Sequence, residues 1–127
     1  MQSRADVVRM AYNFNCPPLA VSVKEAPVSF FRLDSPSVIL ETVKAGEPPL
    51  RDGQPADNKK TVIRLFESCG GRSTAKIYTR LPYVSVQECD GLEEAVGPVQ
   101  QLLLHDGELS FESSFKPFQV RSFILFY

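Results

Sequence analysis

The sequence LLLHDGELSF occupies residues 102–111 and places Asp106 and Gly107 between two apolar runs. Asp-Gly favours the two central positions of a type I′ turn, where both residues need a positive φ. Because side chains alternate along a strand, the residues on either side of this turn predict a β-hairpin with one apolar face. The predicted buried face carries Leu102, Leu104, Leu109 and Phe111.

Short segments rich in β-branched and aromatic residues continue this pattern along the rest of the chain. Strands at intervals of roughly 8–12 residues, separated by Gly, Pro and polar residues, are typical of antiparallel sandwiches. Helix signals are almost absent. The sequence therefore predicts an all-β fold, an antiparallel β-sandwich of short strands that forms a single domain over residues 1–127. The predicted strands are residues 19–24, 28–33, 38–43, 61–66, 74–79, 84–88, 101–105, 109–112 and 119–126.

Residues 45–58 (AGEPPLRDGQPADN) interrupt the strand pattern. They have no apolar periodicity and are rich in Pro, Gly and charged residues, a composition typical of surface loops. We expect an exposed, mobile insertion here.

The last predicted strand is apolar on both faces. One face carries Val120, Ile124 and Phe126, and the other carries Phe123, Leu125 and Tyr127. A two-sheet sandwich buries only one face of each strand. Another segment of this chain, a partner surface or the rest of a larger protein must therefore cover the second face.

Composition excludes several classes of partner. The chain has 14 Lys and Arg against 15 Asp and Glu, a net charge of -1, and no basic run interleaved with aromatic residues. This balance argues against binding to nucleic acid or to an anionic membrane. No apolar run reaches the length of about 20 residues that a membrane span needs, and no glycosylation sequon or signal peptide is recognisable. These features favour a soluble, intracellular protein.

The three cysteines, Cys16, Cys69 and Cys89, are spaced too widely for a Cys-x-x-Cys motif, and their odd number does not fit a disulfide scaffold. We expect reduced, partly buried thiols.

Candidates for catalysis are few. The single histidine, His105, flanks the predicted turn, where an exposed position is expected. Glu93 and Glu94 are adjacent, so in a strand they would point to opposite faces and could not converge on one glycosidic bond. Glu41 and Glu67 lie on predicted strands and could meet in space, although a role in surface ion pairs is the expected one. We assign no catalytic, cofactor-binding or metal residue.

A sugar-binding module would display flat aromatic side chains, and this chain has no Trp. The aromatic residues that could serve, although core or rim packing is expected for each, are Tyr78, Tyr83, Phe115 and Phe118. The arginines expected to form ion pairs at the surface or at an interface, rather than to clamp a substrate, are Arg64, Arg72 and Arg80.

Several stretches, taken in order, resemble the C-terminal region of the family 38 α-mannosidases. RMAYNFNCPPL (9–19) resembles its "AYxxNxPL" entry, SPSVILETVK (35–44) its "SxNVVLxxVK" strand, and TVIRLFESCGG (61–71) its "LVLRLYExxG" strand and turn. CDGLEE (89–94) resembles "CNLLEE", and FKPFQVRSF (115–123) resembles the closing "FxPFEIxTF". The departures are Cys16 in the turn region, Phe66 in place of Tyr, and Asp90-Gly91 in place of a more apolar pair. The resemblance extends over nearly the whole chain and is greatest to the cytosolic and vacuolar branch of the family.

The resemblance implies an enzyme that hydrolyses terminal α-mannosyl residues of oligosaccharides with an Asp nucleophile and a divalent metal, commonly zinc. Both groups belong to an N-terminal α/β barrel that this chain does not contain. The chain is then expected to be a non-catalytic structural and interface domain whose partner is the catalytic domain of the same protein, with homo-oligomer formation left open. The implied location is the cytoplasm, with the vacuole or lysosome as alternatives.

Three alternatives remain on the sequence alone. The first is an autonomous carbohydrate-binding module, which the absence of Trp disfavours. The second is a protein-interaction sandwich unrelated to sugars. The third is a self-sufficient enzyme, which would need metal ligands that one histidine and scattered carboxylates do not supply.

Overall fold

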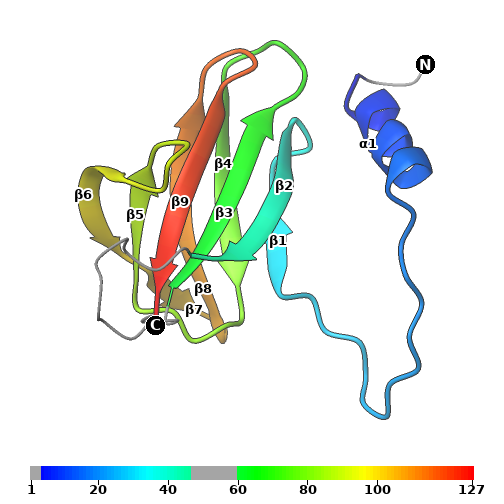
Figure 1. Ribbon diagram of the computed structural model, residues 1–127, viewed down its shortest axis with the longest axis horizontal. Helices are drawn as coiled ribbons and strands as arrows, with labels where there is room; N and C mark the ends of the chain where they lie inside the picture. Colours follow the sequence, from blue (N-terminus) through cyan, green and yellow to red (C-terminus); the bar gives the residue numbers. More distant parts are fainter. Residues whose placement is uncertain (1–3, 47–59) are drawn as a thin grey trace.

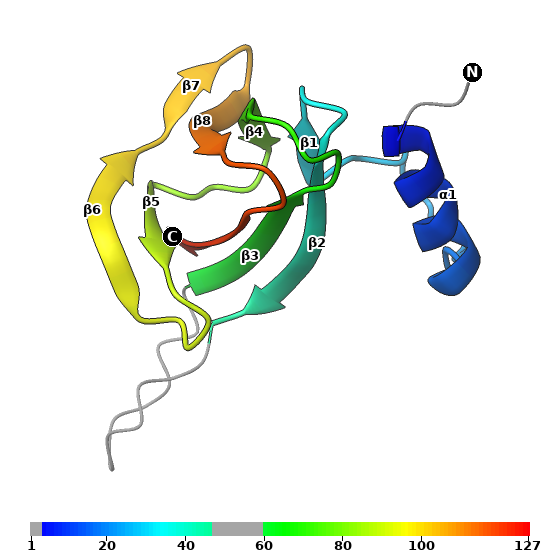
Figure 2. The ribbon, with the colours of Figure 1, turned by 90° about the horizontal axis from the view of Figure 1, so that it is seen from above.

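The computed structural model describes residues 4–46 and 60–127. Two antiparallel sheets face each other, and a helix lies beside them (Figures 1 and 2). The predicted all-β sandwich is therefore confirmed. Residues 47–58 of the predicted insertion lie outside the described residues. Its first residue, Ala45, is the last residue of a strand.

The smaller sheet has four strands in the order β1-β4-β8-β7. They are β1 (Phe31–Leu33), β4 (Ser73–Thr79), β8 (Glu108–Phe115) and β7 (Leu103–His105). The larger sheet has five strands in the order β2-β3-β9-β5-β6. They are β2 (Val38–Ala45), β3 (Lys60–Glu67), β9 (Val120–Phe126), β5 (Ser85–Cys89) and β6 (Ala95–Gln101).

The hydrophobic core lies between the two sheets. In the larger sheet Ile63 pairs with Phe123, and in the smaller sheet Ile77 pairs with Phe111. The rings of Phe111 and Phe123 meet edge to face with 5.1 Å between their centroids, which joins the sheets at the centre. The buried residues of this core are Val38, Ile63, Leu65, Ala75, Ile77, Tyr83, Val86, Phe111, Phe115, Phe123 and Leu125.

A second, smaller apolar cluster lies on the outer face of the larger sheet and consists of Val62, Cys89 and Ile124, with Phe126 packed against it. Lys44 on β2 is the register partner of Val62, so it lies on the same face. Lys44 forms an ion pair with Glu93 in the β5–β6 turn, and β3 and β9 lie between β2 and β5. The β5–β6 turn therefore reaches across the outer face, and the chain itself covers part of the second apolar face that the sequence predicts.

The predicted hairpin is present as β7 and β8. Asp106 and Gly107 have φ values of 49° and 77°, as a type I′ turn requires. Phe111 is buried and Leu109 partly buried, but Leu104 is exposed, so its predicted burial is wrong. Leu104 does pair with Leu109, but β7 is the edge of its sheet and leaves the side chain in solvent.

The predicted strands after residue 37 are confirmed, with shifts of a few residues, apart from two differences. The predicted strand 101–105 is interrupted at Leu102, and β6 at Ala95–Gln101 was not predicted. This strand contains Gly97 and Pro98, residue types that are typical of turns and not of strands. Because β6 is an edge strand, it tolerates a proline that cannot donate a hydrogen bond.

The prediction fails most clearly near the N-terminus. Helix α1 (Arg4–Asn15) was not expected, residues 19–24 form no strand, and only Phe31–Leu33 of the predicted strand 28–33 forms one. Residues 19–24 alternate as a strand would, but no neighbouring strand pairs with them within the described residues. In the described part of the chain, no helix has the length and apolar character to span a membrane.

Helix α1 lies to one side of the sandwich, next to β1 and β2 (Figure 2). It touches the sandwich at few points. The rings of Tyr12 and Phe66 are 6.4 Å apart, the Tyr12 hydroxyl donates to Glu41 at 3.3 Å, and the Arg4 guanidinium donates to the carbonyl of Cys69 at 3.3 Å. We call residues 4–30, the helix with the segment that follows it, the N-terminal arm.

Candidate functional site

One end of the sandwich is organised around the carboxylate of Glu67, the last residue of β3. This side chain is fully buried, at 0% exposure. Its Oε1 accepts a hydrogen bond from the backbone N–H of Cys69 at 2.8 Å, and its Oε2 accepts from Gly70 at 2.7 Å and Phe118 at 3.0 Å. Glu67 thus ties the β3–β4 turn to the β8–β9 turn, and we call this arrangement the Glu67 clamp.

The clamp keeps a buried charge stable. Burial opposes ionisation of Glu67, but the backbone N–H groups of Phe118, Cys69, Gly70 and Gly71 outweigh it, so the pKa of Glu67 lies below its ordinary value. A carboxylate with both oxygens occupied by backbone donors cannot also serve as a general acid. Glu67 is therefore a structural group in this fold.

The β3–β4 turn fits against the β8–β9 turn at one glycine. Gly70 has a φ of 81°, and a Cβ there would come within 2.7 Å of the ring of Phe118. Phe118 itself has a φ of 57°, a backbone conformation that residues other than Gly adopt rarely. Both turns are therefore held in defined conformations.

Arg121 on β9 joins the two sheets near the same end. Its Nε and Nη2 donate to the carboxylate of Glu88 at 2.8 Å and 2.5 Å, and its Nη1 donates to the hydroxyl of Ser113 and the carbonyl of Ser114, each at 2.7 Å. The hydrogen bond from Arg121 is the main cause that lowers the pKa of Glu88. The charge of Arg121 is thus compensated by a bidentate partner.

A cleft of about 490 Å³ opens beside these groups. In the β4–β8 ladder Ser73 faces Phe115 and Thr74 faces Ser114. Arg72 directly precedes this ladder and Lys116 directly follows it, so the two cations lie at the ends of adjacent strands. We call this site the cationic cleft, which is lined by Arg72, Ser73, Thr74, Ser114, Phe115, Lys116, Gln119 and Arg121.

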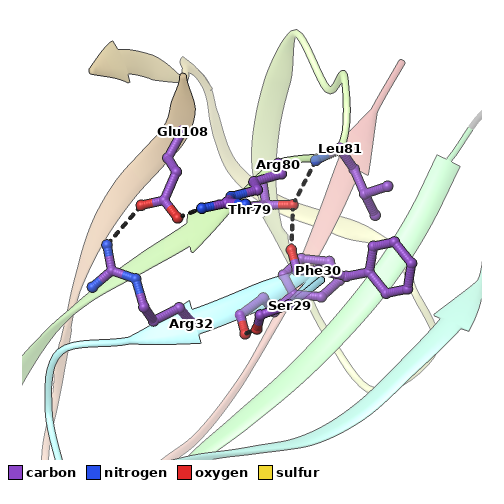
Figure 3. Close-up of polar contacts among 8 residues, drawn as sticks. Ser29, Phe30, Arg32, Thr79, Arg80, Leu81 and Glu108 are labelled. Carbon is purple, nitrogen blue, oxygen red and sulfur yellow. Dashed lines mark hydrogen bonds and ion pairs between the residues drawn. The ribbon is translucent and has the colours of Figure 1, made fainter. Parts of the chain in front are cut away.

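A second polar cluster surrounds Glu108, at the start of β8 (Figure 3). The Arg32 guanidinium lies 3.8 Å from the centre of the Tyr78 ring and 2.7 Å from Glu108 Oε2. Arg80 Nε lies 3.4 Å from Glu108 Oε1. Nearby, the Thr79 hydroxyl donates to the Phe30 carbonyl at 2.8 Å, which fixes the chain entering β1. Both arginines of this cluster already have an anionic partner.

The structure separates the carboxylates that the sequence singled out. Glu41 is exposed and accepts a hydrogen bond from Tyr12, whereas Glu67 is buried among backbone donors, so the two do not act on a common group. Glu93 pairs with Lys44, and Glu94 is exposed. His105 is exposed and lies 3.2 Å from Asp106, which confirms its expected position beside the turn. Among the described residues, no three His, Cys, Asp or Glu side chains gather as a metal site would require.

The predicted core or rim packing of the aromatic residues is confirmed for three of them. Tyr83 and Phe115 are buried, and Tyr78 lies under Arg32. Phe118 is 65% exposed and lies against Gly70.

The arginines singled out in the sequence differ in their partners, and the cysteines differ in their burial. Arg64 donates to the Ser122 hydroxyl at 3.0 Å, and Arg80 forms the expected ion pair with Glu108. Neither Arg64 nor Arg72 forms an ion pair within residues 4–46 and 60–127, and an ion pair at an interface, the other arrangement expected for them, stays a prediction. The three cysteines are free thiols; Cys89 is buried and Cys69 partly buried, but Cys16 is exposed, so its predicted burial is wrong.

Comparison with known proteins gives the family. Residues 37–123 match the family described as "Glycosyl hydrolases family 38 C-terminal beta sandwich domain". The chain belongs to this family. The resemblance found in the sequence is therefore confirmed, and the chain is a family 38 C-terminal sandwich domain.

The relatives of this family 38 domain are much longer than the chain. It is 35% identical over 125 residues to Alpha-mannosidase 2C1 of Mus musculus and of Homo sapiens, a match that covers 95% of this chain and 11% of each relative. It is 27% identical over 135 residues to Alpha-mannosidase of Saccharomyces cerevisiae, covering 97% of this chain and 12% of the relative.

Sequence reasoning missed both the clamp and the cleft of the family 38 domain. Glu67 stands three residues before Gly70, and a carboxylate just ahead of a Gly-Gly turn can accept the exposed N–H groups of that turn. That signal was available but weak. The contact of Glu67 with Phe118 spans 51 residues of sequence and carries no local signal at all.

Proposed function

We propose that this family 38 domain is a non-catalytic structural and interface module of an α-mannosidase that hydrolyses terminal α-mannosyl residues of oligosaccharides. Its partner would be the N-terminal catalytic domain of the same protein. The names of the relatives, all α-mannosidases, support the activity of the parent protein. The proposed location is the cytoplasm.

The observation that carries the interface role is the composition of the N-terminal arm. Ala5 is the one buried residue between positions 4 and 30. Large apolar side chains in this arm are exposed, with Phe14 at 87% and Leu19 at 92%. A segment with many exposed large apolar side chains is typical of contact sites with other protein. The other exposed apolar residues of the arm include Val7, Val21, Val23, Val28 and Phe30.

The non-catalytic role rests on how the ionisable groups are used. A glycosidase needs two carboxyl groups on opposite sides of one glycosidic bond. Here Glu67 is enclosed by backbone donors, Glu88 is paired with Arg121, and Glu108 is paired with Arg32. Each of these three carboxylates is thus bound to its own donors rather than to a common group.

The proposal puts the divalent metal, expected to be zinc, in the catalytic domain. A catalytic zinc site takes three protein ligands from His, Cys, Asp or Glu. No such group occurs in the described part of this chain, and His105 stands alone on an exposed turn. The described residues therefore do not fit a zinc site.

Hydrolysis of an aryl α-mannoside tests the proposal. The 127-residue chain would be compared with the longer protein made from its complete reading frame, each with and without a chelator. We expect hydrolysis by the longer protein only, and loss of that activity with the chelator. Hydrolysis by the 127-residue chain alone would contradict the non-catalytic role.

The carbohydrate-binding alternative retains one observation in its favour, since Phe118 presents an exposed ring next to the β3–β4 turn. Titration of the 127-residue chain with mannose, followed by the chemical shifts of the Phe118 ring, separates the two functions. Saturable shifts that disappear in the Phe118→Ala variant would favour sugar binding. The interface role predicts no saturable change.

A further inference from the structure

The cationic cleft holds two charged groups that the fold does not use. The side chains of Arg72 and Lys116 make no hydrogen bond, ion pair or ring contact with any residue in the ranges 4–46 and 60–127. The third cation, Arg121, is committed to Glu88. On the adjoining strands, Glu112 faces Lys76 in the register and so has a cation opposite it. The cleft therefore carries two uncompensated positive charges.

The two free cations stand on turns that the Glu67 clamp already holds in place. Arg72 comes two residues after Gly70, and Lys116 comes two residues before Phe118; the carboxylate of Glu67 accepts from both Gly70 and Phe118. The backbone of each turn is thus ordered without a ligand. A site ordered in advance loses less conformational entropy when a ligand binds.

The rest of the cleft offers hydrogen-bond donors. The hydroxyls of Thr74 and Ser114, on adjacent strands, share one hydrogen bond at 3.2 Å, which leaves one of their two protons to donate elsewhere. Gln119 Oε1 accepts from the backbone N–H of Lys116 at 2.9 Å, which leaves the amide N–H groups of Gln119 as donors. A guanidinium, an ammonium and neutral donors together complement a group with several negatively charged oxygens.

We propose that the cationic cleft binds a phosphate-type oxyanion, with Arg72 and Lys116 as its charge partners and one hydroxyl of the Thr74–Ser114 pair as a further donor. The cleft, at about 490 Å³, is larger than a phosphate group and leaves room for the molecule that carries it. All residues of the proposed site belong to this chain, so the site is complete without a catalytic domain.

Calorimetric titration of the 127-residue chain with inorganic phosphate at low ionic strength tests this site, with sodium chloride of matched ionic strength as the reference. We expect saturable binding that weakens as salt is added. Arg72→Gln and Lys116→Gln should each weaken phosphate binding about tenfold or more, because each removes a charge-assisted contact. Both side chains are exposed and make no contact in the described part of the chain, so both variants should keep their fold, which circular dichroism checks.

Lys24→Gln is the matched control, because Lys24 is an exposed cation outside the cleft. It should bind phosphate as tightly as the parent chain. Absence of saturable phosphate binding would overturn the proposal. Equal affinity of the Arg72→Gln, Lys116→Gln and Lys24→Gln chains would overturn it as well, since binding would then not involve the cleft.

A parallel titration with a hexose phosphate and with the unphosphorylated hexose identifies the source of the oxyanion. Tighter binding of the hexose phosphate than of inorganic phosphate would support the site and point to a phosphorylated sugar as its ligand. Equal affinities would support a site for the phosphate group itself. Binding of the hexose without any binding of phosphate would contradict the proposal.

Discussion

The N-terminal arm and the sandwich use similar residues in opposite ways. Leu65 in β3 is fully buried, whereas Leu19 in the arm is 92% exposed. The alternation of apolar and polar residues in 19–24 is as regular as in many of the strands that do form. The difference is that β3 has β2 and β9 as neighbours, while residues 19–24 pair with no described strand.

The alternation of apolar and polar residues in a segment therefore indicates only that one side of the segment must be covered. In the sandwich the opposing sheet supplies the cover, and the free energy of burial stabilises the fold. Residues 19–24 of the arm are exposed and have no such cover among the described residues. The exposed apolar residues of the arm therefore fit the proposed interface and do not contribute to the core of this domain.

The largest expected effect comes from truncating the core. Leu65→Ala should lower the free energy of unfolding by about 2–5 kcal/mol, because it leaves a cavity in a close-packed interior. Leu19→Ala, the same change in the arm, should stay within about 0.5 kcal/mol of the parent chain. Urea unfolding measures both. Similar losses for the two variants would remove the contrast between arm and sandwich.

The next effect concerns the Glu67 clamp. Glu67→Gln replaces an acceptor oxygen by an amide that cannot accept from the backbone N–H groups, and should cost about 1–3 kcal/mol at pH 7. Glu94→Gln, on an exposed side chain, should cost nothing measurable.

The pH dependence of stability in the Glu67→Gln variant tests the role of the charge. Because the pKa of Glu67 is lower in the folded chain, its contribution to stability is complete above the ordinary glutamate pKa of about 4.3 and is lost as the pH falls through the folded value. The stability difference between Glu67→Gln and the parent chain should therefore shrink below about pH 4. A difference that stays constant from pH 7 to pH 3 would show that the charge of Glu67 is not what holds the turns.

A smaller effect is expected at the turn itself. Gly70→Ala should lower the free energy of unfolding by about 1–2 kcal/mol, because alanine is strained at positive φ and its Cβ would meet the Phe118 ring. Gly71→Ala has open space around its Cβ and serves as the control. If thermal unfolding shows equal losses for the two variants, the close fit of the two turns is not important for stability.

The smallest effect is expected in the arm. Phe14→Asp should leave the unfolding of the 127-residue chain unchanged within about 0.5 kcal/mol, since the side chain is 87% exposed. In the longer protein the same substitution should lower stability or activity, because it would place a charge in an apolar interface. An unchanged longer protein would argue that Phe14 lies outside any interface.

The sequence predicted the sandwich well where each strand carries its own signal. The hairpin at Asp106-Gly107 was predictable because its turn chemistry is local. Strand β6 was not predictable from the sequence. It contains Gly97 and Pro98, and a strand accommodates a proline when it lies at the edge of its sheet, as β6 does. Helix α1 was not predictable either, because it packs on the sandwich through isolated contacts such as that of Tyr12 with Phe66.

The candidate site was less predictable than the fold. Glu67 was recognisable in the sequence as an ionisable residue. The backbone N–H groups that donate to both oxygens of its carboxylate come from two turns far apart in the chain. Arg72 was expected to be an ion-pair partner like Arg80. Only the spatial arrangement shows that Arg80 meets Glu108 while Arg72 meets no described carboxylate.

Hydrogen exchange of the backbone amides, compared between the 127-residue chain and the longer protein, tests the interface role most directly. The account predicts that residues 4–30 exchange rapidly in the 127-residue chain and become protected in the longer protein, while the core strands β3 and β9 are protected in both. Equally rapid exchange of residues 4–30 in both proteins would contradict it, because the arm would then dock on nothing.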